Sequence, residues 1–538
     1  MAHAATLAHW SDMFAQGRFM QPHADLKSRP KKISINKKIV YLSSIQALHS
    51  AMVFEQQPRE LDLFTTFNVH ERSGFLPPTP PPTRLSSTYE PWEVTLDLAI
   101  QQRLHLGDDP SITEEQKATN EEWRAAVRDM PVLSAEELES DEEKRRAHLV
   151  LAYLTHFYIH SLPLSEPVRI PPPLTIPLLK VSEILDIPPL LIYADTGIYN
   201  WYPEGGEASL PTTETIRTQT SFTNSIHEEE FYLCATRIEL RGVEALSLMR
   251  SISHLLASAY MVSSSTQSSS LEPSGPSEAD VLNDKISSHL ARLSIVVQDL
   301  RTLLLRVREK CDPEVYYTCV RPWFRGEDST PGREWVFEGG VYPSGRTPNG
   351  GGERLRELSG PSAGQSALIH LLDIFLGVDH SYGAGGIQQK AHAMGKQSGM
   401  AKRPKSFMER MQTYMPTPHR LFLEYVKRDP YPLRPFVLSL TPGSSSPPSV
   451  TALTDAYNTC VRCLKEFRDA HMIIATLYII GPARRDQKRR AAANAVATDG
   501  EKQEGKQSEL KGTGGTDLVK FLKDTRTRTE EAIVKEEI

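Results

Sequence analysis

Apolar residues recur at alternating steps of four and three along residues 453–480, which is the period of an α-helix and not of a strand. The pair Gly481-Pro482 follows, and such a pair typically stops a helix. The pattern therefore predicts one long helix with a single buried face. That face consists of Leu453, Tyr457, Cys460, Leu464, Phe467, His471, Ile474 and Tyr478.

The histidine in this stripe is the first candidate for chemistry. A buried imidazole needs a partner for its ring nitrogens. A backbone carbonyl is the commoner partner, which would make His471 an ordinary core residue. A metal is the alternative, and haem iron accepts a single proximal histidine. Arg468 lies one turn earlier on roughly the same face, where its guanidinium would reach a haem propionate. The stripe alone leaves both interpretations open.

Helical periodicity continues through most of the chain, whereas strand patterns are nearly absent. It marks residues 92–106, 121–130, 231–261 and 290–307, and a capping-box pattern at Ser134 predicts a helix over 134–160. The fold class expected is mainly α. We expect a large all-helical domain over 221–538 and a smaller mixed, mostly helical N-terminal domain over 65–220.

Segments of biased composition interrupt these elements. Residues 1–64 form an N-terminal extension that we expect to be poorly ordered, as a tail rather than a presequence. Low-complexity, glycine-rich or charged stretches predict flexible inserts in the larger domain. These inserts are residues 262–280, 339–357, 379–405 and 484–511.

Composition narrows the function classes. The chain has 538 residues, 39% of them hydrophobic and 24% charged, and its net charge of −6 gives no case for nucleic-acid binding. No apolar run approaches the ~18–20 residues that cross a bilayer. Five cysteines in so long a chain favour a reducing, cytoplasmic location. Cys460 and Cys463 form a CxxC without a second pair, which argues against zinc or redox use.

A second informative segment covers residues 360–378, GPSAGQSALIHLLDIFLGV. Its small residues either let the backbone approach a flat ligand closely or form a tight loop that caps the following helix, with Ser362 or Ser366 as N-cap. His370, in that helix, is a rival haem ligand that fits a core or rim position better. His156 and His160 have metal-like spacing but lack the glutamate of HExxH, so we interpret them as packing residues.

Eight motifs along the chain together resemble the indoleamine 2,3-dioxygenase family, in its microbial or fungal form. They stand in the family's order and cover the chain from about Phe67 to the C-terminus, apart from the inserts. The motifs are IPPLLIYAD (187–195), EEFYLCA (229–235), YYTCVRPWFRG (316–326), VFEGG (336–340), residues 360–378, YMPTPHRLFL (414–423), FRDAHMIIATLYIIGPA (467–483) and GTGGTDLVKFLK (512–523).

This resemblance implies a cytoplasmic, haem b-dependent enzyme that is active with ferrous iron. It implies insertion of O2 across the indole C2–C3 bond of L-tryptophan to give N-formylkynurenine, the first step of the kynurenine pathway toward NAD. The partners implied are L-tryptophan, O2 and an electron donor that keeps the iron ferrous. Nucleic acid and membrane are not expected as partners, and the protein is expected to be a monomer.

The resemblance also assigns roles to individual residues. His471 takes the place of the proximal iron ligand, and Arg468 that of the arginine that meets a haem propionate. The distal loop of the family corresponds to Ser362, Ala363 and Gly364, which contact the cofactor, the first two also facing the substrate. Arg321 corresponds to the residue that holds the substrate carboxylate. The remaining substrate contacts implied are Phe231 and Tyr316 flanking the indole, Tyr193 at the inner end of the pocket, and Thr513 on a mobile GTGG loop. No side chain is implied as a catalytic acid or base.

Several positions depart from vertebrate members of the family. Tyr316 stands for a phenylalanine and adds a hydroxyl, and Ala235 stands where a distal serine is found. Pro361 replaces a glycine at the start of the distal loop. These departures motivate an alternative hypothesis, a haem-binding paralogue with low turnover that acts as a sensor or in another role. A helical scaffold without haem is a third hypothesis.

Overall fold

The computed structural model describes residues 66–206, 211–265, 276–330, 332–340, 358–380, 406–440, 446–497 and 518–535. The chain from Asp62 to Ile538 forms one compact unit, and Met1–Leu61 is a separate unit that lies outside the described residues, as does the extension predicted there. Helices dominate the described residues, which confirms the mainly-α class. One continuous hydrophobic core runs from Phe67 to Val534. The predicted division near residue 220 stays a prediction.

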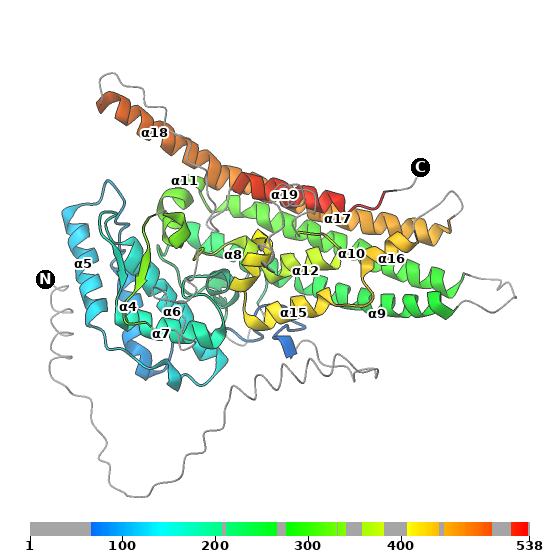
Figure 1. The fold of residues 1–538 in the computed structure, drawn as a ribbon, viewed down its shortest axis with the longest axis horizontal. Coiled ribbons are helices and arrows are strands. Elements are labelled where there is room, and N and C mark those ends of the chain that lie inside the picture. Colours follow the sequence, from blue (N-terminus) through cyan, green and yellow to red (C-terminus); the bar gives the residue numbers. More distant parts are fainter. Residues whose placement is uncertain are drawn as a thin grey trace, which may run out of the picture. The chain divides into compact units, whose positions relative to one another are not determined.

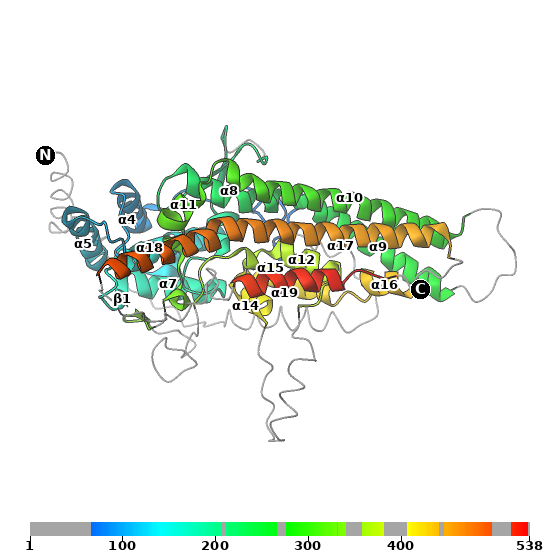
Figure 2. The same ribbon diagram turned by 90° about the horizontal axis from the view of Figure 1, so that it is seen from above.

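Long helices lie side by side and form the larger part of the unit (Figures 1 and 2). Helix α10 (Glu278–Arg306) packs against both α9 (Val243–Ser265) and α17 (Pro448–Ala475), and α19 (Leu518–Glu531) lies along α17. The first part of the stripe predicted for this helix, Leu453, Tyr457, Cys460 and Leu464, is fully buried, as the helical period requires. His471 is only half-buried, and Tyr478 lies beyond the end of α17.

Shorter helices gather at one end of the unit, in blue to cyan in Figure 1. They are α4 (Glu90–Gln101), α5 (Glu114–Asp129), α6 (Asp141–His160) and α7 (Pro172–Leu185). The prediction of a helix from Ser134 is wrong at its start. Ser134 caps only the 3-10 turn Ala135–Glu137, because the complete capping box lies at Ser140, whose hydroxyl accepts from the N–H of Glu143.

The remaining elements connect these helices. Strand β1 (Val168–Ile170) pairs in parallel with β4 (Trp335–Phe337), and β2 (Trp201–Pro203) pairs antiparallel with β3 (Ile216–Thr218). The other α-helices are α8 (Ile226–Arg241), α11 (Pro313–Val315), α12 (Ala367–Phe375), α14 (Phe407–Met411), α15 (Thr417–Lys427), α16 (Leu433–Ser439) and α18 (Gly481–Ala497). The short 3-10 and π helices are η1 (Ser87–Tyr89), η2 (Ala135–Glu137), η3 (Ala194–Ile198), η4 (Val307–Glu309), η5 (Tyr316–Val320), η6 (Arg321–Phe324), η7 (Glu327–Ser329), η8 (Ala363–Gln365), η9 (Gln412–Tyr414) and η10 (Thr476–Ile480).

The helix that carries His471 does not end at Gly481-Pro482, so that prediction is wrong. A π turn, η10, follows α17, and α18 begins at Gly481 and continues the rod in Figure 2. The N–H of Gly481 bonds to the carbonyl of Thr476, five residues earlier. Pro482 therefore falls in the first turn of a new helix, where its missing N–H removes no bond.

The predicted inserts lie mostly outside the described residues. Helix α9 extends into the first of them as far as Ser265, and α10 begins within it at Glu278. Likewise α18 occupies residues 484–497 of the last one. Thr513 and the GTGG segment, residues 512–515, fall outside the described residues.

Truncation of Leu464 to alanine tests the packing of α17. Leu464 is fully buried, so we expect Leu464→Ala to lower the free energy of unfolding by about 2–5 kcal/mol. Ile295→Ala on α10 is the matched control, because 46% of that side chain is exposed and its loss is expected to cost less than about 0.5 kcal/mol. Urea unfolding followed by circular dichroism measures both; equal effects would contradict this packing.

Candidate active site

A cavity of about 210 Å³ lies among α8, the loop before α12, α14, α17 and α19. Its walls are mainly apolar and aromatic. The cavity brings together eight of the ten residues that the sequence singled out as site residues, and Ala235, one of the noted departures, also lines it. The eight are Tyr193, Phe231, Tyr316, Ser362, Ala363, Gly364, Arg468 and His471.

The imidazole of His471 is the central feature of this cavity. It projects from the last turn of α17 and is half-buried, because part of its surface faces the cavity. Its ring makes no hydrogen bond to any described residue. Burial is the main cause that lowers the pKa of His471 to about 4, and the nearby positive charge of Arg468 adds to the shift. The ring is therefore neutral near pH 7 and presents a free nitrogen lone pair, which is the form that binds a metal.

His370 and His156, two other histidines considered as metal ligands, do not present a free nitrogen lone pair. His370 donates from Nε2 to the carbonyl of Gly364 at 2.9 Å and accepts from Gln412 at Nδ1 at 3.0 Å. His156 bonds to the carbonyl of Trp323 and to the N–H of Leu191. With both nitrogens occupied, neither ring has a lone pair for iron, in agreement with the packing roles expected from sequence.

His160 is also a packing residue. Its Nε2 lies 2.9 Å from the carbonyl of Arg325, and its ring packs edge-on against Trp323 and Trp335. Within the described ranges, no group of three or more metal-binding side chains gathers anywhere. No helix in those ranges is long and apolar enough to cross a membrane.

Arg468 lines the cavity one turn before His471 but is already engaged by the protein. Its Nη2 lies 2.5 Å and 2.7 Å from the two carboxylate oxygens of Asp373 on α12, and its Nη1 contacts the hydroxyl of Thr529. Burial alone would raise the pKa of Asp373, but the charges of Arg468 and His380 outweigh it and lower that pKa. A ligand carboxylate that meets Arg468 would therefore share it with Asp373.

The loop before α12 presents its backbone to the cavity. Ser362 caps the 3-10 turn η8 by accepting from the N–H of Gly364 at 3.3 Å. A Cβ added to Gly364 would lie 3.2 Å from the ring of Phe407 and 3.3 Å from Met411, so only glycine fits there without a shift. The bond from His370 to the Gly364 carbonyl fixes this loop from behind. The interpretation as a capping loop is confirmed, since Ser362 caps η8 and Ser366 caps α12. The close approach to a flat ligand stays a prediction.

Aromatic rings from α8 and η5 form one wall. The ring centroids of Phe231 and Tyr316 lie 4.4 Å apart, and Phe324 and Tyr478 pack around them. Flat apolar walls of this kind suit a planar aromatic ligand.

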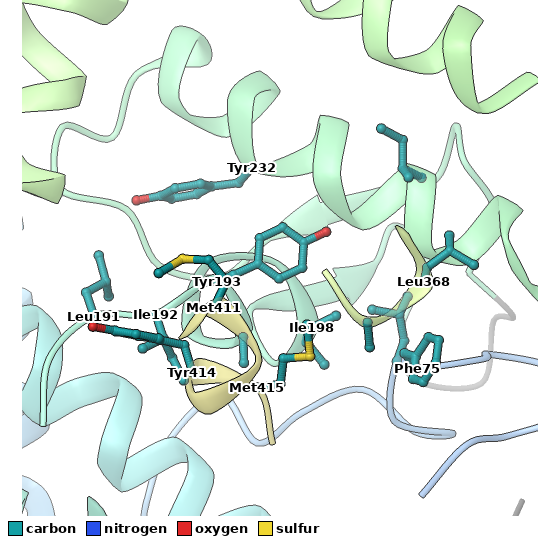
Figure 3. Close-up of a cluster of buried hydrophobic side chains, with 14 of the residues drawn as sticks. Phe75, Leu191, Ile192, Tyr193, Ile198, Tyr232, Leu368, Met411, Tyr414 and Met415 are labelled. Carbon is teal, nitrogen blue, oxygen red and sulfur yellow. The ribbon is translucent and has the colours of Figure 1, made fainter. Parts of the chain in front are cut away.

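A buried carboxylate accepts hydrogen bonds from two residues that line the cavity. The side chain of Glu239, on α8, is 1% exposed, and its Oε1 accepts from Tyr193 at 3.0 Å and from Ser366 at 2.6 Å. Its Oε2 makes no hydrogen bond to any residue that the structure describes. Burial raises the pKa of Glu239 to about 7, although the two hydrogen bonds stabilise the charged carboxylate and act to lower that pKa. Figure 3 shows Tyr193 beside Met411 and reaching toward α8, which carries Tyr232.

Arg321 does not line the cavity. It begins η6, directly after the π turn that contains Tyr316, and its Cζ lies 5.7 Å from the ring centroid of Tyr317. Burial lowers its pKa below the ordinary arginine value. Leu518, Phe521, Leu522 and Thr525 on α19 complete the wall of the cavity. Thr513 lies outside the described residues.

Sequence reasoning missed Glu239 and Asp373. Glu239 follows the motif 229–235 on the same helix, and Asp373 lies within the motif 360–378, but nothing in a single sequence marks a carboxylate as buried. A charged residue among apolar helix positions was the one available signal, since Asp373 interrupts the run from Leu371 to Phe375.

The residues present fit a haem group. A neutral imidazole without a partner faces a cavity with apolar walls, a glycine-bearing loop borders that cavity, and an arginine lies one turn from the imidazole. One histidine is sufficient as a protein ligand to haem iron. The structure thus defines a helical protein with an aromatic-walled cavity onto which an imidazole faces.

Comparison with known proteins identifies the family. The family model for indoleamine 2,3-dioxygenase matches residues 63–532, and the chain belongs to this family. The mouse indoleamine 2,3-dioxygenase 2 is 28% identical over 473 residues, which covers 87% of this chain and 95% of the mouse protein. The indoleamine 2,3-dioxygenase of Saccharomyces cerevisiae is 29% identical over 486 residues, 88% of this chain and 94% of the yeast protein. A 6-hydroxytryptophan 2,3-dioxygenase of Fusarium equiseti is 28% identical over 480 residues, 88% of this chain and 99% of that protein.

Replacement of Glu239 by glutamine tests the buried carboxylate. Because folding raises its pKa from 4.5 to about 7, the folded state holds a proton that the unfolded state releases between these values. The free energy of unfolding should therefore fall as pH rises from 4.5 to 7, by on the order of 3 kcal/mol. Glu239→Gln should flatten this decline.

Glu115→Gln on the exposed face of α5 is the control for that measurement. Urea unfolding of the three proteins at pH 5, 6, 7 and 8 gives the pH dependence. An unchanged slope in Glu239→Gln would show that Glu239 is ionised in the folded protein throughout this range.

Proposed function

We propose that this protein is a haem b-dependent dioxygenase that converts L-tryptophan and O2 into N-formylkynurenine, the first step of the kynurenine route toward NAD. The observation that carries the proposal is the neutral, unpartnered imidazole of His471 at the wall of an aromatic cavity. Membership of the indoleamine 2,3-dioxygenase family supports it. The bound haem would supply ferrous iron at which O2 is activated, and a separate electron donor would keep the iron reduced.

The residues of this chain hold and orient the reactants. His471 is the proximal iron ligand, and Arg468 meets a haem propionate while it stays paired with Asp373. Ser362, Ala363 and Gly364 let the backbone pass close to the cofactor, because none of them carries a large side chain.

The substrate lies against the aromatic wall. Phe231 and Tyr316 flank the indole, Tyr193 limits the inner end of the pocket, and Arg321 binds the carboxylate as a paired cation. Thr513 orders the bound amino acid from the GTGG loop, which closes over the site. No side chain is needed as an acid or base, and the apolar walls exclude water from the reacting atoms.

We further infer that the protein works in the cytoplasm as a monomer, without nucleic acid or membrane as a partner. The five cysteines support a reducing location: the four in the core, Cys234, Cys311, Cys460 and Cys463, are unpaired thiols, and so is the exposed Cys319.

His471→Ala is expected to abolish most haem binding, because it removes the protein ligand to the iron. The Soret absorbance per protein after haem loading measures this, and added imidazole should restore part of it by occupying the space of the lost ring. His370→Ala is the matched control: it can loosen the distal loop but should leave the ligation spectrum unchanged. Full haem retention by His471→Ala would refute the ligand assignment.

Aerobic turnover of the haem-loaded, reduced protein tests the reaction itself. We expect N-formylkynurenine to accumulate from L-tryptophan, and Arg321→Leu to lower kcat/KM by at least about a hundredfold while keeping the Soret band, since a buried carboxylate loses its paired cation. An unchanged kcat/KM would show that the carboxylate is held elsewhere.

Other outcomes of the same assay separate the competing hypotheses. A strong Soret band without product from the wild-type protein would indicate the low-turnover paralogue, with Ala235 and the other departures as the first residues to revert. Product from 6-hydroxytryptophan but not from L-tryptophan would indicate that the protein acts on the substrate of the Fusarium relative. Absence of a Soret band would favour the helical scaffold.

A further inference from the structure

Four tyrosines line the cavity, and three of them bond their hydroxyls to the protein. Tyr193 donates to Glu239 at 3.0 Å, Tyr232 to Glu228 at 2.7 Å, and Tyr478 to the carbonyl of Cys311 at 2.6 Å. The fourth, Tyr316, makes no side-chain hydrogen bond to any residue in the described ranges, although only 3% of it is exposed.

The hydroxyl oxygen of Tyr316 is not among the buried side-chain atoms that lack a partner, so it is open to the cavity. A ligand that fills the cavity and displaces water from this hydroxyl without offering an acceptor would lose about 1–3 kcal/mol, a cost that phenylalanine at the same position would not incur. The ring of Tyr316 is already packed against Phe231, so the hydroxyl adds nothing to the wall itself. Burial also raises the pKa of Tyr316, so the hydroxyl stays protonated and acts as a donor. A bound ligand that offers an acceptor would remove the cost.

The backbone places this donor beside a cation. Residues Tyr316–Val320 form a π turn, and the N–H of Arg321 closes it by bonding to the carbonyl of Tyr316. In a π turn, residues five apart stand nearly one above the other, so the side chains of Tyr316 and Arg321 leave the backbone on nearly the same side. The charge of Arg321 also acts on the Tyr316 hydroxyl. A hydroxyl donor and a guanidinium on one side match an acceptor-rich anion.

We propose that the Tyr316 hydroxyl is a second donor to the substrate carboxylate, next to Arg321, and that this pair makes the site selective for indole amino acids over the corresponding amines. The inference rests on the proposed function, because it takes Arg321 as the carboxylate-binding residue. It assigns to Tyr316 a role in specificity beyond its place in the aromatic wall.

A comparison of L-tryptophan with tryptamine, which lacks the carboxylate, tests this. In Tyr316→Phe, we expect kcat/KM for L-tryptophan to fall by about tenfold or more, mainly through KM, and kcat/KM for tryptamine to stay within about twofold. Tyr232→Phe and Tyr478→Phe are matched controls, because their hydroxyls bond within the protein. They should leave the ratio between the two substrates unchanged even if both activities fall.

Two results would overturn the proposal. Equal losses with both substrates would show that the hydroxyl supports packing alone. A change in the preference between L-tryptophan and a ring-hydroxylated tryptophan, with the tryptamine ratio unchanged, would show that the hydroxyl faces the indole ring.

Calorimetric binding of L-tryptophan and tryptamine to the haem-loaded protein, without O2, separates this inference from the proposed function. Binding of L-tryptophan that weakens in Tyr316→Phe, but without turnover of the wild-type protein, would support the inference and refute the dioxygenase. Turnover of L-tryptophan by the wild-type protein, with a ratio between L-tryptophan and tryptamine that Tyr316→Phe leaves unchanged, would support the dioxygenase and refute the inference. If the wild-type protein binds neither compound, both fail.

Discussion

The packing of α17 against α10 determines where the chemistry of this protein can occur. One face of α17 is fixed in the core over six turns, and hydrogen bonds lock its rotation: the Tyr457 hydroxyl donates to the carbonyls of Leu376 and Ala532, and Asn458 bonds both backbone groups of Val534. With that face buried, the helical period leaves His471 no freedom to turn away from the cavity. The position of the imidazole is thus a consequence of core packing some distance away from it along the helix.

Electrostatics in the same region follow from burial. Arg468 is tolerated in the core because Asp373 neutralises its charge and accepts two hydrogen bonds from it. The hydroxyl of Thr529 on α19 accepts a third hydrogen bond from Arg468. The neighbouring imidazole stays neutral because burial and this guanidinium both disfavour its cation. Arg468 therefore has two effects: with Asp373 and Thr529 it holds α12, α17 and α19 together, and its charge helps to keep the histidine in the neutral form that binds a metal.

Much of the fold and part of the site follow from sequence patterns. The stripe on α17 predicts a buried face and the direction of His471, and the small residues around Gly364 indicate a close backbone approach, because both depend on neighbours in sequence. Features that depend on residues distant in the sequence do not follow from such patterns. The capping box belongs to Ser140 rather than Ser134, and a new helix begins at Gly481 after a π turn, so Pro482 falls in its first turn, where a proline is tolerated. The burial of Glu239 depends on Tyr193 and Ser366, which are 46 and 127 residues away, so no local pattern reveals it.

Hydrogen bonds within the protein hold the loop before α12 at the rim of the cavity and also engage the hydroxyls of Tyr193, Tyr232 and Tyr478. Gln365 bonds the N–H of Tyr193 and the carbonyl of Gly360, and His370 holds the carbonyl of Gly364, so the loop before α12 is fixed at three points without a ligand. Most polar groups near the cavity are satisfied within the protein in this way, which leaves a wall with few competing hydrogen-bonding sites. In such a wall each remaining polar group has a large effect on which ligand binds, since an unmatched donor is not compensated by water. Selectivity in this pocket therefore depends on the few polar side chains that have no partner among the residues that the structure describes, such as His471 and Tyr316.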